Sequence, residues 1–393
     1  MKKPMSFASR LDNLKPEGAY AVMTKAQALE SDGRHIVHLE IGQPDFDTFS
    51  QISQAGIDAI QAGQTRYNPP AGVPGLRQLI AKTAGEQRQL QIDPKQVVIG
   101  PGAKPGLFFP TLALVEAGDE VIYPDPGFPT YRAMIEVAGG IPVPVPQLED
   151  NNFSFDLAAF DSLISERTKL IILNSPSNPT GGVMPLEDLE HIAQAAADHG
   201  FWIISDEIYS RLDFDGKGVP SITALPGMLE QTIIVDGFSK TYAMTGWRLG
   251  YGIMPESLAQ RVELLLTHSI GCTATFTQFA GIQALAADQE MVSNMVEDYK
   301  QRRERLVSGL NAIPGISCQL PQGAIYAFPN VSSFNIPVRQ LADRILTEAG
   351  VAVLPGTDFG KYGEGYLRLC FAASNEEIDT ALEQFNNFFT ADL

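Results

Sequence analysis

The chain has 393 residues, more than the roughly 250–300 at which a single hydrophobic core stops growing, so we expect two domains. Apolar residues make up 44% and charged residues 19% of the chain, a globular balance that excludes a largely disordered protein. The formal net charge of −18 argues against nucleic acid or an anionic membrane as a partner, because both require a basic face.

The amino-terminal segment and the cysteines favour a cytoplasmic protein. No apolar core follows the two lysines near the start, so we expect no signal peptide, and no stretch approaches the ~20 apolar residues of a membrane span. Cys272, Cys318 and Cys370 are widely spaced and odd in number, which fits neither a disulfide framework nor a zinc site. We expect them to be small buried residues in a reducing compartment, and we expect no metal.

Short apolar runs alternate with helical patterns between residues 95 and 255. Runs that are apolar on both faces and separated by helices indicate a mostly parallel sheet that is covered on both sides. Pro110 interrupts the first helical pattern, which predicts a kink or a late start. We expect strands at 97–100, 120–124, 169–174, 201–207 and 232–238, and helices at 106–117, 131–138 and 185–200.

The pattern changes after residue 290 and indicates a smaller α+β domain. A charged amphipathic helix is expected at 294–312. Short strands are expected at 324–330, 351–356 and 366–372, and two further helices at 337–349 and 375–388. The first 45 residues have no obvious place in the large sheet and are assigned to the smaller domain or to a partner subunit. The expected fold class is therefore α/β, with a large domain over 46–288 and a smaller domain formed by 1–45 and 289–393.

Chemically suggestive residues follow the predicted strands, where ligands bind in open α/β sheets. The segment FSKTYAMTGWRLGY (238–251) places Lys240 directly after an apolar run and Arg248 eight residues later. These two residues are either a solvated lysine and a surface ion pair, or a desolvated amine nucleophile and a fixed charge for a phosphate dianion. The Gly-rich turn at 99–107 precedes a helix, whose backbone amides suit phosphate.

Three further segments each carry an open alternative. In ISDEIYSRL, Asp206 is either a helix cap or a carboxylate that stays ionised against a pyridinium nitrogen. Tyr209 either packs at the rim or donates its hydroxyl proton to the phenolic oxygen of the same ring. In NSPSNPTGG, Asn178 either initiates a turn or donates its amide to the same oxygen. In YLRLCFA, Arg368 is either exposed at a sheet edge or a bidentate carboxylate receptor.

These residues occur together and in order, and this combination resembles the fold-type I, class I/II aminotransferases, the aspartate aminotransferase-like group. The resemblance spans roughly residues 30–390 and is most specific around Lys240, Gly246 and Arg248. It implies pyridoxal 5′-phosphate as cofactor, held as a Schiff base by Lys240, which then moves the proton between Cα and the cofactor C4′. It also implies that Asp206 binds the pyridine nitrogen and that Tyr209 and Asn178 bind the phenolic oxygen.

The resemblance implies further roles at the phosphate, the ring and the substrate. Arg248 and the backbone of three residues would hold the phosphate, together with Tyr67 from a neighbouring subunit, which implies a homodimer with shared sites; the three are Gly102, Ala103 and Lys104. Phe128 would stack on the ring or pack in the core. Arg368 would bind the substrate α-carboxylate, and Gly42 would lie near that carboxylate or be a turn glycine.

One position departs from the family pattern. Relatives commonly carry Ser or Thr three residues before the lysine, where a hydroxyl holds the phosphate, but this chain has Gly237. The loss of that hydrogen bond predicts weaker cofactor retention, by about 1–3 kcal/mol. Ser239 lies on the same face of an extended chain and is a partial substitute, as is a water.

Three functions remain in view. The first is transfer of an amino group between an L-α-amino acid and a 2-oxo acid in a ping-pong cycle, with Arg368 gripping both substrates. The second is another reaction on the same scaffold, such as a C–S β-lyase or a synthase reaction. The third is a regulator that uses this fold to bind an effector, but residues 1–40 are too short for a DNA-binding module and the chain is acidic.

Overall fold

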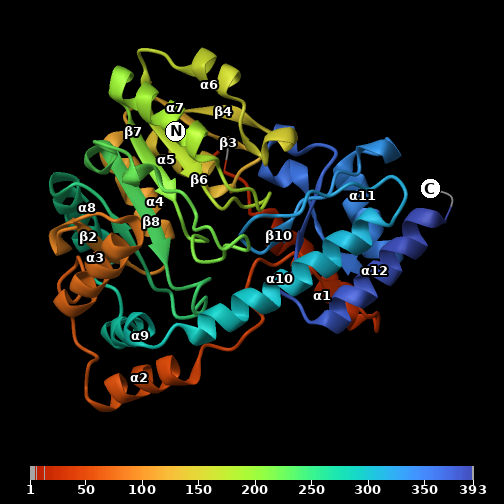
Figure 1. Cartoon of the computed structure of the whole chain (residues 1–393), viewed down its shortest axis with the longest axis horizontal. Helices are drawn as coiled ribbons and strands as arrows, with labels where there is room; N and C mark the ends of the chain where they lie inside the picture. The colour runs from red at the N-terminus through yellow and green to blue at the C-terminus, as the bar shows by residue number, and fades with distance from the viewer. Residues whose placement is uncertain (1–4, 6, 13, 392–393) are drawn as a thin grey trace.

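The computed structural model describes residues 5, 7–12 and 14–391, and its largest element is an eight-stranded sheet (Figure 1). The strand order is β2-β9-β8-β7-β6-β3-β4-β5. Strands β4, β3, β6, β7 and β8 are parallel, β9 is antiparallel to both of its neighbours, and β5 is antiparallel to β4. The strands are β2 (Val97–Gly100), β3 (Glu120–Asp125), β4 (Ile141–Leu148), β5 (Ser154–Phe155), β6 (Thr168–Asn174), β7 (Trp202–Asp206), β8 (Thr232–Gly237) and β9 (Gly250–Ile253).

Helices cover both faces of this sheet, which confirms the α/β prediction. Successive strand residues point to opposite faces, so Ile204 packs in the cluster with the first group of helices and Ile203 packs with the second. The first group is α4 (Lys104–Leu114), α5 (Thr130–Ala138) and α8 (Glu256–Ser269). The second is α3 (Pro74–Arg88), α6 (Leu157–Leu163), α7 (Leu186–His199) and α9 (Thr275–Ala286), with α2 (Ser50–Gln61) against α9.

The prolines explain where the predicted elements differ from the structure. Strand β4, which was not predicted, contains Pro142, Pro144 and Pro146, but it pairs with β5 only at its last two residues. Proline is therefore tolerated there, because the outer edge of β4 requires no N–H donors along most of its length. The late start predicted for the first helix is wrong, because α4 begins at Lys104 and includes Pro110.

The rest of the chain forms a second region, drawn mainly in blue in Figure 1. It holds the antiparallel sheet β10-β13-β12, made of β10 (Tyr326–Ala327), β13 (Leu367–Cys370) and β12 (Leu354–Pro355). It also holds the parallel pair β1 (Val37–His38) and β11 (Val351–Ala352), so this amino-terminal strand lies in the second region of its own chain. Its helices are α1 (Gly18–Ser31), α10 (Glu290–Asn311), α11 (Val338–Arg344), which continues as a π-helical turn Ile345–Ala349, and α12 (Asn375–Thr390). The boundaries at 46 and 288 stay a prediction.

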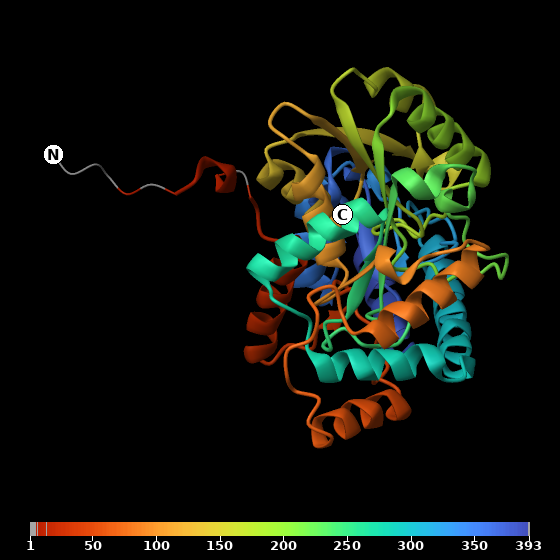
Figure 2. The ribbon, with the colours of Figure 1, turned by 90° about the vertical axis from the view of Figure 1, so that its left-hand side faces the viewer.

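The described residues ahead of α1, 5, 7–12 and 14–17, lead away from the body of the chain (Figure 2), and Met5 and Phe7 among them are exposed. Cys318 and Cys370 are buried as expected, whereas Cys272 is only partly buried. Across the described ranges, no helix combines the length and the apolar character needed to cross a membrane.

Candidate active site

The carboxyl ends of β6 and β7 bring two of the predicted site residues together. The backbone N–H of Asn178 donates to Asn174 Oδ1 over 2.8 Å, and Asn174 Nδ2 donates to the carbonyl oxygen of Asp206 over 3.0 Å. Asn174 is the last residue of β6 and Asp206 the last of β7. Because neighbouring parallel strands end at the same edge of a sheet, these bonds fix the loop that carries Asn178 beside Asp206.

Asp206 is buried, and each of its two carboxylate oxygens accepts a hydrogen bond. The Tyr131 hydroxyl donates to Asp206 Oδ2 over 2.8 Å, and the Ile208 N–H donates to Oδ1 over 3.3 Å. Burial raises the pKa of Asp206 to about 6, and the bond from Tyr131 opposes that rise. The carboxyl is therefore mostly ionised at pH 7 and favours a cation beside it. Tyr131, the second residue of α5, was not predicted as a site residue, although it lies only three positions after Phe128.

Two tyrosine hydroxyls meet near the predicted substrate side. Tyr209 and Tyr326 lie with their hydroxyl oxygens 2.7 Å apart and their rings edge to face at 5.7 Å. Tyr326, on β10, was not predicted as a site residue, because its partner lies 117 positions away in the sequence. A Cβ atom at Gly42 would overlap the Tyr326 hydroxyl, so the glycine is required by this close approach.

The side chain of Lys240 lies against Gly42 and near the ring of Tyr209. Its Nζ atom donates to the carbonyl oxygen of Gly42 and lies 5.8 Å from the centroid of the Tyr209 ring. Burial lowers the pKa of Lys240 to about 8, and the positive charges of Arg368 and Arg248 act in the same direction. A pKa of about 8 leaves roughly a tenth of this amine neutral at pH 7, far more than its ordinary pKa of 10.5 would, and the neutral form is the nucleophile.

Arg368 is buried in β13, the central strand of its sheet, so the edge-exposed alternative is wrong. Its Nη1 atom donates to Asn178 Oδ1 over 3.2 Å, and Nη2 donates to the carbonyl oxygen of Glu40. Its guanidinium carbon lies 4.5 Å from the ring centroid of Tyr326 and 5.0 Å from that of Phe359. Within the described part of the chain Nε has no hydrogen-bond partner, so this buried cation has donor capacity left for an anion.

The Gly-rich turn and Arg248 come together at the start of α4. Gly102 has φ of +86°, which favours glycine, and a Cβ atom there would displace the Arg248 guanidinium, so the glycine lets that side chain lie against the turn. Arg248 is exposed, and its Nη1 atom donates to the carbonyl oxygen of Thr245 over 2.9 Å. The helix N-terminus and the guanidinium together form a cradle suited to a phosphate dianion.

The side chains of Lys104 and Phe128 lie next to this cradle. Lys104 Nζ is 5.2 Å from the ring centroid of Phe128 and 2.5 Å from Glu17 Oε1, so its charge is paired with the residue that precedes α1. Phe128 is partly buried and packs edge to face on Tyr131 at 5.7 Å. Phe128, which is predicted to stack on the cofactor ring, therefore contacts Tyr131. Tyr131 in turn is hydrogen-bonded to Asp206, the predicted partner of the ring nitrogen.

Three other positions were singled out from the sequence: Tyr67, Ser239 and Gly237. Tyr67 is 97% exposed and does not join the cluster within this chain, and its role at a neighbouring subunit stays a prediction. Ser239 is buried. A Cβ atom at Gly237 would lie 3.0 Å from Gly250 Cα and 3.1 Å from the carbonyl oxygen of Leu249, so the tight β8–β9 pairing accounts for the missing hydroxyl.

Comparisons with known proteins agree over nearly the whole chain. The family model described as aminotransferase class I and II matches residues 34–385. A putative aminotransferase of Bacillus subtilis, YugH, is 38% identical over 96% of this chain and 97% of its own length. The solved structure of the Thermus thermophilus aspartate aminotransferase with maleate has a TM-score of 0.93 at 36% identity, covering 98% of this chain and 100% of that one.

A Pyrococcus horikoshii structure described as an aromatic aminotransferase has a TM-score of 0.88 at 36% identity, covering 93% of this chain and 98% of that one. The relatives therefore include proteins named for acidic and for aromatic amino acids, and they share the fold expected from the sequence. The chain belongs to the class I and II aminotransferase family and is an aminotransferase of fold type I.

Proposed function

We propose that this enzyme moves the amino group of an L-α-amino acid to a 2-oxo acid in two half-reactions, with pyridoxal 5′-phosphate bound covalently to Lys240. The observation that carries the proposal is the convergence of a partly buried amine of lowered pKa, a buried carboxylate and a buried guanidinium within one cluster. The family generally uses this cofactor, and the elimination and regulator alternatives gain no support from the relatives, which are named aminotransferases.

The donor set of the site fits the cofactor at both ends. Gly102 leaves room that a Cβ atom would fill against Arg248, which supports a phosphate bound by that guanidinium and by the amides of Gly102, Ala103 and Lys104. At the other end, Asp206 would accept from the protonated ring nitrogen, since a buried carboxylate without a cation is costly. When bound, the cofactor supplies an electron sink for the electrons released at the substrate Cα.

Two hydrogen-bond donors are free to bind the phenolic oxygen. Asn178 uses its Oδ1 atom to accept from Arg368, which leaves Nδ2 able to donate. Tyr209 shares a hydrogen bond with Tyr326; if Tyr326 donates, the Tyr209 hydroxyl proton is available for the phenolic oxygen. Phe128 would stack on the ring, and Ser239 would add a hydroxyl near the phosphate.

Lys240 is the proposed acid and base. A pKa of about 8 lets the amine take up and release a proton at the substrate Cα near neutral pH without a large energetic penalty in either direction. Arg368 would hold the α-carboxylate in both half-reactions through its unpaired Nε and the remaining Nη hydrogens, with Gly42 beside it. The carboxylate then fixes the Cα–H bond relative to Lys240.

The proposal includes a homodimer in a cytoplasmic setting. Tyr67 is almost fully exposed at 97%, and Ile57 and Ile60 present apolar side chains to solvent on α2. A second copy that covered this surface would bring Tyr67 to the phosphate of the neighbouring site and would bury these residues. Amino acid and 2-oxo acid are the proposed substrates; aspartate and aromatic amino acids come first in the test, because relatives carry those names.

An absorbance titration tests the function directly. The loaded enzyme is mixed with single amino acids, and loss of the cofactor absorbance band identifies the amino donors; adding a 2-oxo acid must restore the band. Lys240→Ala should abolish both changes and turnover. Full activity in Lys240→Ala would overturn the mechanism, and release of pyruvate and ammonia from cysteine-type substrates without a 2-oxo acid would establish elimination instead.

A further inference from the structure

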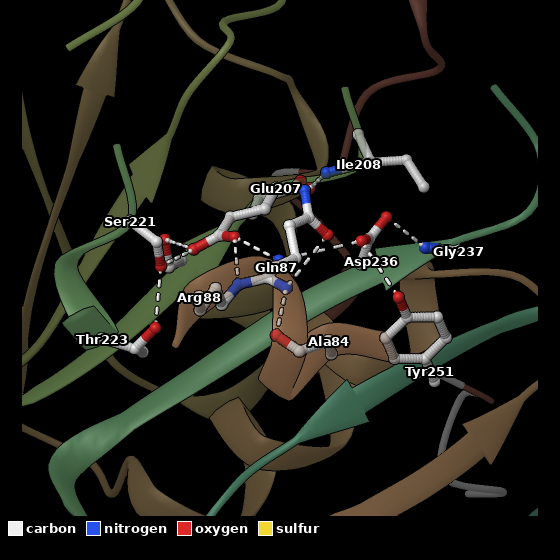
Figure 3. Close-up of polar contacts among 12 residues, drawn as sticks. Ala84, Gln87, Arg88, Glu207, Ile208, Ser221, Thr223, Asp236, Gly237 and Tyr251 are labelled. Carbon is white, nitrogen blue, oxygen red and sulfur yellow. Dashed lines mark hydrogen bonds and ion pairs between the residues drawn. The ribbon is translucent and has the colours of Figure 1, made fainter. Parts of the chain in front are cut away.

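A buried ionic network lies under the site and is shared by three separate parts of the chain (Figure 3). Arg88, the last residue of α3, donates through Nε and Nη2 to Glu207 Oε2 over 3.0 and 2.5 Å. The same Nη2 atom lies 3.9 Å from Asp236 Oδ2. Arg88, Glu207 and Asp236 are 7%, 3% and 5% exposed, so all three side chains are removed from solvent. Burial raises the pKa of Asp236 to about 7, and the charge of Arg88 opposes that rise.

The remaining hydrogen bonds leave little freedom in this network. Glu207 Oε1 accepts from Ser205 Oγ over 3.1 Å and from Ser221 Oγ over 2.6 Å. Asp236 accepts from the Gly237 N–H over 2.7 Å and from the Tyr251 hydroxyl over 3.0 Å. Both carboxylates are therefore held by several donors, and Arg88 supplies the only formal positive charge drawn in Figure 3.

Each carboxylate belongs to a segment that carries a proposed site residue. Glu207 follows Asp206 directly, and its backbone N–H donates to the carbonyl oxygen of Val235 on β8 over 2.8 Å. Asp236 lies on β8, just before the turn that leads to Lys240. Arg88 consequently fastens the segments that carry Asp206 and Lys240 to the same helix.

The network does not touch the site itself, because side chains alternate across a strand. Asp206 shares its face of the sheet with Ile204 and with Tyr131, whereas Glu207 points to the opposite face, which α3 covers. A change at Arg88 would therefore reach Lys240 through the backbone of these two segments, whereas Asp206 also feels the negative charge of Glu207, which raises its pKa.

We infer that Arg88 is a positioning residue that, through Glu207 and Asp236, fixes the distance between the lysine amine that holds the cofactor and the carboxylate that partners its ring. This inference rests on the proposed roles of Lys240 and Asp206. The two segments must keep one spacing while the cofactor and substrates come and go, and a buried ion pair in which two guanidinium N–H groups donate to one carboxylate oxygen resists displacement more than an apolar contact does.

The pKa of Lys240 is the readout that separates positioning from general stability. The charged groups that act directly on this pKa are Arg368 and Arg248, with the Cys370 thiol opposing them. Burial is the largest cause of the lowered pKa, so a segment that loosens admits water and returns the pKa toward 10.5. A shift caused at Arg88 thus reports the position of Lys240.

The test uses the full chain stripped of cofactor, with labelling of Lys240 by an acylating reagent followed across pH by peptide mass spectrometry. Arg88→Met should raise the labelling midpoint by about one pH unit and, in the loaded enzyme, should raise the dissociation constant for pyridoxal 5′-phosphate about tenfold. Arg88→Lys, which keeps the charge without the fork, should lie between. Arg77→Met is the matched control, because Arg77 is on the same helix but donates to Val97 O over 2.8 Å outside the network.

Arg88→Met leaves two buried carboxylates without their cation and can fail to fold, so the double variant Arg88→Met/Glu207→Gln is made in parallel. An unchanged labelling midpoint in a folded Arg88 variant, or an equal shift in Arg77→Met, would overturn the inference. Failure of the proposed function looks different: the parent protein would not bind the cofactor at Lys240 at all.

Discussion

Replacing Lys240 by methionine is expected to stabilise the cofactor-free protein at neutral pH. Burial and two neighbouring guanidinium groups lower the pKa of this amine from 10.5 to about 8. Folding at pH 7 therefore costs about 3 kcal/mol for this one group, because the unfolded chain holds the proton more tightly. Loss of the hydrogen bond to the Gly42 carbonyl offsets about 1 kcal/mol, so the net gain in the free energy of unfolding is about 2 kcal/mol.

The sign of the pH dependence follows from the same two pKa values. Between pH 8 and 10.5 the unfolded chain binds more protons at Lys240 than the folded chain does, so the stability of the parent rises with pH in this window. Below pH 8 the full penalty applies. The advantage of Lys240→Met should therefore be largest at and below neutrality and should shrink as the pH rises toward 10.5.

Urea unfolding of the stripped parent and variant at several pH values measures this difference. Lys82→Met is the matched control, because the Lys82 side chain is 69% exposed and pairs loosely with Glu86 at 3.9 Å. A stability difference for Lys240→Met that stays constant from pH 7 to 10, or a parent that is more stable than the variant at pH 7, would refute the reasoning.

Three other substitutions probe separate parts of the site. Tyr131→Phe removes the 2.8 Å donor to Asp206, so the pKa of that carboxyl should rise further and cofactor binding, measured by absorbance, should weaken by about 1–3 kcal/mol. Arg368→Lys loses the planar fork, so kcat/KM for amino donors should fall about 100-fold with unchanged cofactor affinity in equilibrium dialysis. Gly102→Ala places a methyl group against Arg248 at a positive φ, so thermal unfolding should show a loss of about 1–3 kcal/mol and the cofactor should bind more weakly.

Local sequence patterns were sufficient to predict five strands of the large sheet, β2, β3, β6, β7 and β8, and three of its covering helices, α4, α5 and α7. The apolar runs that became β6, β7 and β8 are buried, and α7 begins after Pro185 and ends before Gly200 as its punctuation predicts. Strand β4 was missed because its three prolines indicate a non-strand unless the unpaired edge is known. Pairing is a tertiary property that local sequence does not contain.

The site residues that the sequence did not predict were missed for one reason: each acts through a partner that is distant in the sequence. Tyr131 and Tyr326 act through partners 75 and 117 positions away, and a lone tyrosine in an apolar segment looks like core packing. Arg88 is harder still, because a polar residue at the end of a helix predicts a solvated side chain. The close approaches at Gly42 and Gly102 likewise become visible only when the opposing side chain is placed.

The proposed mechanism requires that the amine of Lys240 holds the cofactor. Borohydride reduction of the loaded enzyme fixes the bond between them, and digestion followed by peptide mass spectrometry locates the added mass. We expect a single phosphopyridoxyl group on the peptide that contains Lys240, and none in the Lys240→Ala variant. Modification of a different lysine, or no stable adduct in a protein that remains active, would contradict it.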